Sequence, residues 1–413
     1  MSIGAAFTRG MRRIVVLVLL LAGCAGADDP QPPTPLQREI TGLVTQMATL
    51  HPEVDHQMPL QALRAEARAL ADEAPELSRD ELVVGLLRLT TLGERDGHGG
   101  IFLHDPAHTR PFHFFPLRVH DFADGVHVVA EPDSAANVGK RVVSVDGVPI
   151  DAVVTRLEPL IPHDNGSTVR LLLPEYLVCA EVLRGLGIVE GPATYRFDDG
   201  SEVTLDSIES SAYAGLGTAF TPLPMPGDPL QYRGLDESFL LEPLERGRSL
   251  YLGYRHVESP PQELLDSILA AARRKAFHRL VVDARFNGGG DNTTYWPLLE
   301  LLQSGPLRQR GKVVVLAGRM TFSAAGNFVA SVDHETNAII VGEPTGGAPN
   351  QWGDRLPIEL PLAGLTAYVA AEWVEVAPGD TRLAVEPDVA VEPTVADFRA
   401  GRDPVLARAL ALP

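Results

Sequence analysis

The stretch that decides the fold is residues 279–347, in which three apolar runs each end in a turn of small residues. The first run is LVVDARF at 280–286, followed by NGGG at 287–290; the second is KVVVLAG at 312–318, followed by MTFSAAG at 320–326; the third is IIVGEPTGG at 339–347. Short runs rich in valine and isoleucine are typical of strands that are buried on both faces. Because helical segments separate these runs, their order predicts an α/β fold with a parallel sheet.

Ser323 follows the second run and begins a predicted helix. Its hydroxyl would therefore lie near the unpaired N–H groups of a helix N-terminus, where negative charge is stabilised. The glycines at 288 and 289 let the backbone approach a substrate carbonyl, since no Cβ stands in the way. We predict that Ser323 is a nucleophile and that the N–H groups of Ala324 and of Gly288 or Gly289 form an oxyanion hole. The alternative is that Ser323 is an ordinary N-cap and the glycines an ordinary turn.

The order of four motifs, NGGG, TFSAA, GEPTGG and then EPDVAV at 386–391, resembles the catalytic domain of the tail-specific (C-terminal processing) serine protease family. The similarity covers roughly the last 170 residues, and four motifs in the same order are more specific than any one of them. The resemblance implies a ClpP/crotonase-like α/β core at residues 245–400 and peptide-bond hydrolysis without a cofactor or a metal. Family members with a Ser-Lys dyad carry lysine directly after the Thr-x-Gly turn, where this chain has Gly347, Ala348 and Pro349. The resemblance is therefore to the tricorn-like branch without that dyad.

The predicted base is His98, in the loop ERDGHGG at 94–100. In the tail-specific family and in the tricorn core protease, a histidine from an early loop reaches the serine, and the resemblance gives that role to His98. An imidazole can take the hydroxyl proton and return it to the leaving amine. A surface histidine without a role is the alternative, and His256 is the second candidate base. Glu343 and Asp380 are the candidate orienting acids, and Asp380 is preferred because the tricorn-like pattern has an acid near that place.

Residues 1–23 have the features of a bacterial lipoprotein signal peptide. Three arginines precede the apolar run at 14–22, which is too short to span a bilayer in a mature protein, and LAGC at 21–24 resembles a lipobox. We expect cleavage before Cys24 and lipidation of its sulfur, which would attach the protein to a membrane surface outside the cytoplasm, in the periplasm or at the cell surface. The alternative is a plain secretory signal in which Cys24 has no role.

Three further segments precede the catalytic domain. Residues 24–35 form a proline-rich tether, and residues 36–100 form a helical N-terminal unit with capping-box patterns at Thr34/Gln37 and Ser78/Glu81. Residues 110–165 resemble a PDZ-like module because of GKRVVSVDGVPI at 139–150. Such a module either binds a peptide along a sheet edge or serves only as a packing unit.

The charge of the chain excludes some partners. The formal net charge is −19, and removal of residues 1–23, which contain three arginines and no acid, makes it −22. This excess of negative charge argues against nucleic acid and against an anionic membrane face as partners. The two cysteines are Cys24 and Cys179, so no internal disulfide is expected once Cys24 is lipidated. No Cys/His spacing is typical of a metal site.

These observations predict a lipid-anchored serine endopeptidase that acts on a protein or peptide substrate through an acyl-enzyme. The alternative from another class is a non-catalytic protein on the same fold that binds a hydrophobic ligand or a peptide, as in the modules of the interphotoreceptor retinoid-binding protein. A crotonase-like acyl-thioester enzyme is a third possibility, because it shares the glycine-lined oxyanion hole.

Overall fold

The fold is taken from a computed structural model, which describes residues 32–93 and 97–413. The predicted signal peptide, Cys24 and most of the proline-rich tether therefore lie outside the described residues. Among the described residues, no helix combines the length and the apolar character needed to cross a membrane.

The C-terminal half is built on a six-stranded sheet in the order β18-β13-β12-β11-β10-β9. Its strands are β9 (Phe239–Leu244), β10 (Ser249–Tyr254), β11 (Leu280–Asp283), β12 (Val313–Ala317), β13 (Ile339–Gly342) and β18 (Val389–Ala390). All neighbours pair in parallel except β9, which is antiparallel to β10 at the edge. The parallel α/β sheet predicted from residues 279–347 is thus confirmed.

Both faces of this sheet are covered. The helices α8 (Gln262–Ala272), α9 (Trp296–Leu302) and α10 (Ala324–Glu335) pack on one face, and α12 (Pro404–Leu410) packs on the other. Successive residues of β12 alternate between these two cores, with Val313 and Val315 in the first and Val314 and Leu316 in the second. Because side chains alternate along a strand, an uninterrupted apolar run satisfies both faces.

The N-terminal segment forms three helices, α1 (Pro35–Leu50), α2 (Leu60–Glu73) and α3 (Arg79–Gly93). The capping box at Thr34/Gln37 is confirmed, because each side chain bonds the other residue's backbone N–H. The box at Ser78/Glu81 is confirmed in the same way. Residues of these helices share a hydrophobic core with the middle of the chain.

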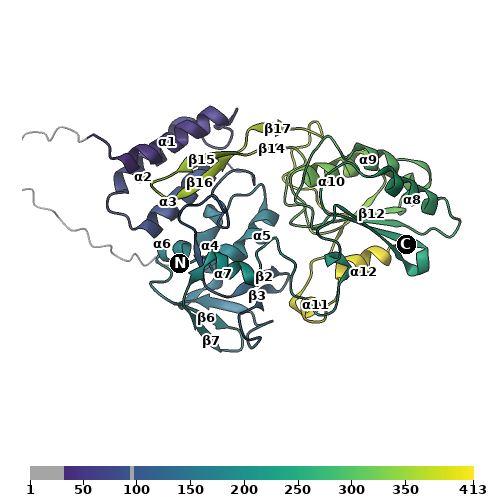
Figure 1. The fold of residues 1–413 in the computed structure, drawn as a ribbon, viewed down its shortest axis with the longest axis horizontal. Helices are drawn as coiled ribbons and strands as arrows, with labels where there is room; N and C mark the ends of the chain where they lie inside the picture. The colour runs from purple at the N-terminus through teal and green to yellow at the C-terminus, as the bar shows by residue number, and fades with distance from the viewer. Residues whose placement is uncertain (1–31, 94–96) are drawn as a thin grey trace, which may run out of the picture.

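A hairpin from the C-terminal half crosses over to these helices. Its strands are β15 (Leu356–Leu360) and β16 (Leu365–Val369), and Figure 1 shows them beside α1 and α2, away from the six-stranded sheet. The Glu39 carboxylate on α1 accepts hydrogen bonds from the backbone N–H groups of Leu362 and Ala363, each at 2.9 Å. The catalytic segment predicted at 245–400 is thus interleaved with the helical N-terminal unit.

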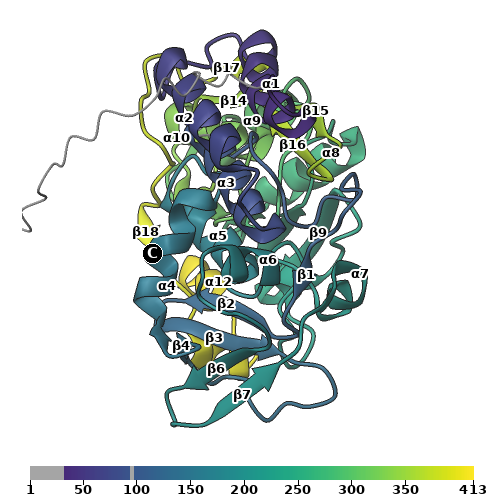
Figure 2. The same ribbon diagram turned by 90° about the vertical axis from the view of Figure 1, so that its left-hand side faces the viewer.

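The middle of the chain contains a two-stranded and a four-stranded sheet. The first is β2 (Arg118–Phe122) with β3 (Gly125–Ala130); the second, in spatial order, is β5 (Val148–Pro149), β4 (Val142–Val145), β6 (Ala193–Phe197) and β7 (Glu202–Leu205). Figure 2 shows these strands at one end of the molecule and α1 at the other. Because β4 pairs with β6, the sheet that contains part of residues 110–165, the segment predicted to be PDZ-like, extends beyond residue 165.

The remaining elements include two further two-stranded sheets, β1 (His113–Phe114) with β8 (Ile208–Glu209) and β14 (Gln351–Gly353) with β17 (Glu372–Val374). The others are the helices α4 (Ile150–Leu157), η1 (Glu158–Leu160), α5 (Gly166–Tyr176), α6 (Ala180–Gly185), α7 (Ser210–Tyr213), η2 (Ala214–Leu216), η3 (Leu230–Tyr232), η4 (Glu245–Gly247), η5 (Gly305–Arg308) and α11 (Val395–Arg399).

Candidate active site

Ser323 occupies the turn between β12 and α10 in a strained conformation. Its φ of 54° and ψ of −132° lie in a region that residues other than glycine rarely adopt. Its side chain makes no capping hydrogen bond to α10, so the interpretation of Ser323 as an ordinary N-cap is wrong. Its Oγ instead lies 3.0 Å from Nε2 of His98, a residue 225 positions away in the chain.

The carbonyl of Ser323 is held on the opposite side of the turn. It accepts hydrogen bonds from the backbone N–H of Asn327 at 3.0 Å and from Nε2 of Gln351 at 2.9 Å. A Cβ at Gly347 would lie 2.8 Å from Oε1 of Gln351 and 3.2 Å from the nitrogen of Ser323. Gly347, the glycine that ends the Thr-x-Gly turn, therefore leaves room for the side-chain amide of Gln351, which holds the carbonyl of the strained serine.

His98 is buried, and its environment keeps the imidazole neutral. Burial, with a smaller effect of the Arg355 cation, lowers the pKa of His98 to about 4, while the Asp354 carboxylate acts in the opposite direction. A neutral ring protonated on Nδ1 presents the lone pair of Nε2 to the Ser323 hydroxyl. The ring also packs on Phe322, with the ring centroids 4.5 Å apart. The pair is thus arranged for proton transfer from Oγ to Nε2 at neutral pH.

Gly97 and Gly100, on either side of His98, occupy positions that do not suit a residue with a side chain. Gly100 has a φ of +115° and forms two backbone hydrogen bonds with Tyr368 of β16, at 2.9 and 2.8 Å. A Cβ at Gly97 would lie 2.6 Å from the ring of Phe322. The crossing hairpin therefore anchors the loop of His98, and the loop can approach the catalytic turn only without a side chain at Gly97.

The two glycines predicted for the oxyanion hole differ in whether their N–H groups already donate a hydrogen bond. The N–H of Gly289 donates to Oδ1 of Asn287 at 3.0 Å, so it is already engaged. Gly288 is exposed and lines the cleft beside Ser323, and within residues 32–93 and 97–413 neither its N–H nor that of Ala324 has a hydrogen-bond acceptor. Gly288 and Ala324 are therefore the donors available to an oxyanion, and the assignment of Gly289 is corrected.

Gly289 instead allows the two catalytic turns to meet. Its φ is +119°, and a Cβ there would lie 2.7 Å from the Cβ of Ser323. We expect Gly289→Ala to displace Ser323 and to lower kcat/KM by about 100-fold or more, since small misplacements of reacting groups have effects of this size. The measurement is peptide hydrolysis alongside thermal unfolding.

Gly200→Ala is the matched control for Gly289→Ala. Gly200 also has a positive φ, +83°, but no atom lies within 4 Å of a Cβ there. Both variants strain the backbone, and only Gly289→Ala presses on the nucleophile. Equal loss of activity in the two variants would contradict the role given to Gly289.

The prediction for Asp380 requires correction. Its carboxylate is held by Arg382 and lies 2.8 Å from Nε2 of His334, and the Arg382 hydrogen bond is the main reason why its pKa is lowered. Within the described chain no hydrogen bond or ion pair joins Asp380 to His98. The turn that carries Asp380 is anchored instead by Asn350, whose Nδ2 donates to the Asp380 carbonyl at 2.9 Å.

The other candidates are also placed away from the Ser323–His98 pair. His256 is exposed and does not line the cleft. Glu343 forms an ion pair with Arg319 at 2.7 Å. Asp283 and Arg285, at the end of β11, form an ion pair with each other at 2.7 Å.

A cleft of about 560 Å³ opens in front of the Ser323–His98 pair. Local sequence gave no signal for several of its residues, because they come from separate parts of the chain and carry no motif. Besides Ser323, His98 and Gly288, the walls include Phe102, Leu103, His104, Asp105, Leu172, Glu175, Tyr176, Phe220, Phe322, Asp354 and Arg355. The guanidinium of Arg355 lies over the rings of Phe102 and Tyr368, at 4.9 and 4.7 Å from their centroids.

Known structures share this fold. Mature CPAF complexed with lactacystin matches over 89% of this chain and 96% of its own, with a TM-score of 0.59 and 14% identity. A mutant of CPAF matches over 89% and 95%, with a TM-score of 0.60 and 14% identity. The photosystem II D1 C-terminal processing protease covers 87% and 94% at 13% identity, but its TM-score of 0.38 is too low to support an argument. No protein-family model and no curated protein sequence matches the chain. The chain thus has the fold of CPAF.

Proposed function

We propose that this protein is a serine endopeptidase that hydrolyses peptide bonds through an acyl-enzyme on Ser323. The observation that carries the proposal is the 3.0 Å contact between Oγ of Ser323 and Nε2 of His98. A buried neutral imidazole beside a strained serine, with two nearby backbone N–H groups that have no acceptor among the described residues, is an arrangement for nucleophilic attack on a carbonyl. The base is thus an imidazole, as in the tricorn-like branch without a Ser-Lys dyad.

In the first half of the reaction, Oγ of Ser323 attacks the carbonyl carbon of the peptide while Nε2 of His98 takes the hydroxyl proton. The N–H groups of Gly288 and Ala324 stabilise the negative charge on the carbonyl oxygen. When the C–N bond breaks, the His98 imidazolium gives its proton to the leaving amine. The acyl group stays on Ser323 as an ester.

In the second half, a water molecule attacks the ester carbonyl and His98 takes one of its protons. The same two N–H groups stabilise the second oxyanion. The bond to Oγ then breaks, and the proton on His98 returns to the serine. His98 gives back each proton that it takes, so the enzyme returns to its starting state at the end of the cycle.

The test of this function is the cleavage of an unfolded protein substrate by the wild-type protein and by its Ser323→Ala variant. We expect new N-termini to accumulate only with the wild type, as shown by mass spectrometry of the products. If the wild type binds the unfolded protein without cleaving it, the non-catalytic binding protein on the same fold replaces the peptidase.

We further propose that Cys24 is lipidated and anchors the peptidase to a bacterial membrane outside the cytoplasm. The support is the lipobox-like LAGC at 21–24 after an apolar run, since acyl chains on a cysteine bind a bilayer through their CH₂ groups. Expressed in a bacterium, the wild type is expected in the membrane fraction and the Cys24→Ala variant outside it. Equal partitioning of the two forms would refute the anchor.

A further inference from the structure

Glu175 is a buried acid in the wall of the cleft that contains Ser323. It lies at the end of α5 and is 6% exposed. One carboxylate oxygen accepts a hydrogen bond from the backbone N–H of Ala219 at 2.6 Å, and the other lies 3.5 Å from Nε2 of His104. Burial raises the pKa of Glu175 to about 7, against the smaller effects of the Ala219 N–H and the Arg118 cation.

In the part of the chain that the structure describes, no lysine or arginine forms an ion pair with Glu175, although the Arg118 cation lowers its pKa. His104, from the loop after Gly100, is stacked on Phe114 and Tyr213, and burial lowers its pKa to about 4, so it is neutral at pH 7. Arg118 of β2 donates to four backbone carbonyl oxygens, those of Leu216, Thr218, Thr221 and Pro222. Tyr213 of α7 and the neighbouring Tyr176 are neutral phenols, because burial raises the pKa of each.

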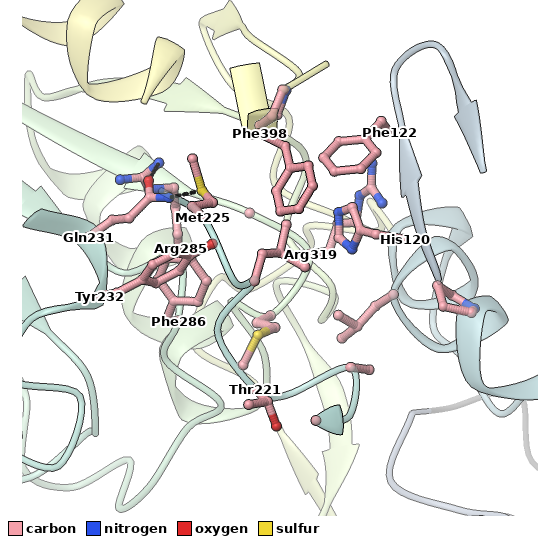
Figure 3. A pocket seen from close by; sticks show the side chains of 18 of the residues that line it. His120, Phe122, Thr221, Met225, Gln231, Tyr232, Arg285, Phe286, Arg319 and Phe398 are labelled. Atoms are coloured by element: carbon pink, nitrogen blue, oxygen red, sulfur yellow. Dashed lines mark hydrogen bonds between the residues drawn. The ribbon is translucent and has the colours of Figure 1, made fainter. Parts of the chain in front are cut away.

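Glu175 also borders a second, smaller cavity of about 120 Å³, which is shown in Figure 3. Aromatic side chains surround this cavity, among them Phe286 and Phe398. Among its other charged groups, Arg285 pairs with Asp403 at 2.8 Å, Arg319 with Glu343 at 2.7 Å and Arg402 with Asp397 at 2.9 Å, and Arg118 donates to backbone carbonyls. Of the three acids that line this cavity, Glu343 and Asp403 each pair with an arginine, whereas Glu175, which also lines the catalytic cleft, forms no ion pair with an arginine or lysine among the described residues.

We propose that Glu175 is a specificity-determining residue that receives a lysine or arginine side chain of the substrate. This inference rests on the proposed peptidase function and names its substrate class. The cleft offers Leu172, Tyr176 and Phe220 for the aliphatic stem of such a side chain, and Glu175 for its cationic end. A cation at this position stabilises the ionised carboxylate that burial otherwise disfavours. The net charge of −19 also favours the approach of basic peptides.

The test compares peptide series that are identical except for lysine or norleucine at one position, scanned across the four residues on each side of the scissile bond. For the wild type we expect kcat/KM to be at least about tenfold higher for lysine than for norleucine at one position, as a charge-assisted hydrogen bond predicts. Glu175→Gln should remove this preference. Glu202→Gln, which removes one acid on the exposed strand β7 outside the cleft, should keep it.

The pH dependence gives a second readout that needs no variant. The lysine preference of the wild type should rise as the pH increases through about 7, because Glu175 ionises there. In Glu175→Gln the ratio of the two kcat/KM values should not change over that range. If Glu175→Gln does not fold, as judged by its thermal unfolding, the wild-type pH profile still decides the question.

Two results separate this inference from the proposed function. If the wild type cleaves peptides without any lysine preference, Glu175 has no such role and the peptidase stands. If no peptide is cleaved, binding of the two peptides to Ser323→Ala and to Ser323→Ala/Glu175→Gln is measured instead. If Ser323→Ala binds the lysine peptide more tightly than the norleucine peptide, and Glu175→Gln removes this difference, the role of Glu175 is supported although no peptide is cleaved. Equal binding of the two peptides overturns it.

Discussion

Ser323→Ala is expected to abolish covalent labelling by a fluorophosphonate probe and to lower peptide hydrolysis by roughly 10⁴- to 10⁶-fold, the loss seen when a catalytic serine is removed. The physical reason is that, among the described residues, Oγ of Ser323 is the hydroxyl in contact with Nε2 of His98, at 3.0 Å, inside the cleft. The fold should persist, because the Ser323 side chain makes no capping bond. The packing of α10 on the sheet therefore does not depend on Oγ.

Labelling is measured by intact-protein mass spectrometry, with thermal unfolding as the measure of folding. Ser267→Ala is the control, because Ser267 is an exposed serine on α8 whose hydroxyl donates to the carbonyl of Glu263, one turn earlier in the same helix. Wild type and Ser267→Ala should both gain one probe adduct, and Ser323→Ala none. An adduct of equal yield on Ser323→Ala would place the nucleophile elsewhere.

His98→Ala is expected to have the second-largest effect, a loss of kcat on the order of 10⁴-fold or more with little change in KM. Without the imidazole, Oγ of Ser323 loses the proton acceptor that lies 3.0 Å away. His256→Ala is the matched control, because that exposed histidine was the alternative base and does not line the cleft. A larger loss in His256→Ala than in His98→Ala would reverse the assignment.

The pH profile tests the same residue in the wild type. A base works only when it is unprotonated, so activity should be present above the pKa of His98 and fall as the pH drops through about 4, rather than near 6.5. Because the Arg355 cation lowers this pKa and the Asp354 carboxylate raises it, Arg355→Gln should move the acid limb of kcat/KM to higher pH and Asp354→Asn to lower pH. Shifts of the same sign in both variants would be inconsistent with these charges.

Much of the catalytic core was predictable from the sequence because its signals are local. The strands within the runs at 280–286 and 312–318 are apolar except at Asp283, which is typical of strands buried on both faces. The turns after them, NGGG and MTFSAAG, are rich in small residues, which allow two backbones to approach each other closely. The capping boxes at Thr34 and Ser78 involve partners three residues apart, so the pattern and the contact coincide.

The errors at the site all concern groups whose roles depend on distant neighbours. Gly288 and Gly289 are equivalent in the sequence, and the Asn287 side chain decides which N–H is free. Asp380 was chosen by its position along the chain, but Arg382 and His334 hold its carboxylate. Asp354, Arg355 and Glu175 carry no motif, and their charges matter only because folding brings them to one cleft.

The sequence by itself determined the parallel sheet, the serine turn and the glycines that this turn needs, since each follows from the chemistry of a few consecutive residues. Tertiary structure alone decided that the hairpin of β15 and β16 crosses to the N-terminal helices, pairs with Gly100 and so carries His98 to Ser323. The physical reason is that a hydrogen bond between residues 225 apart depends on how whole elements pack, and packing leaves no periodic trace in either segment.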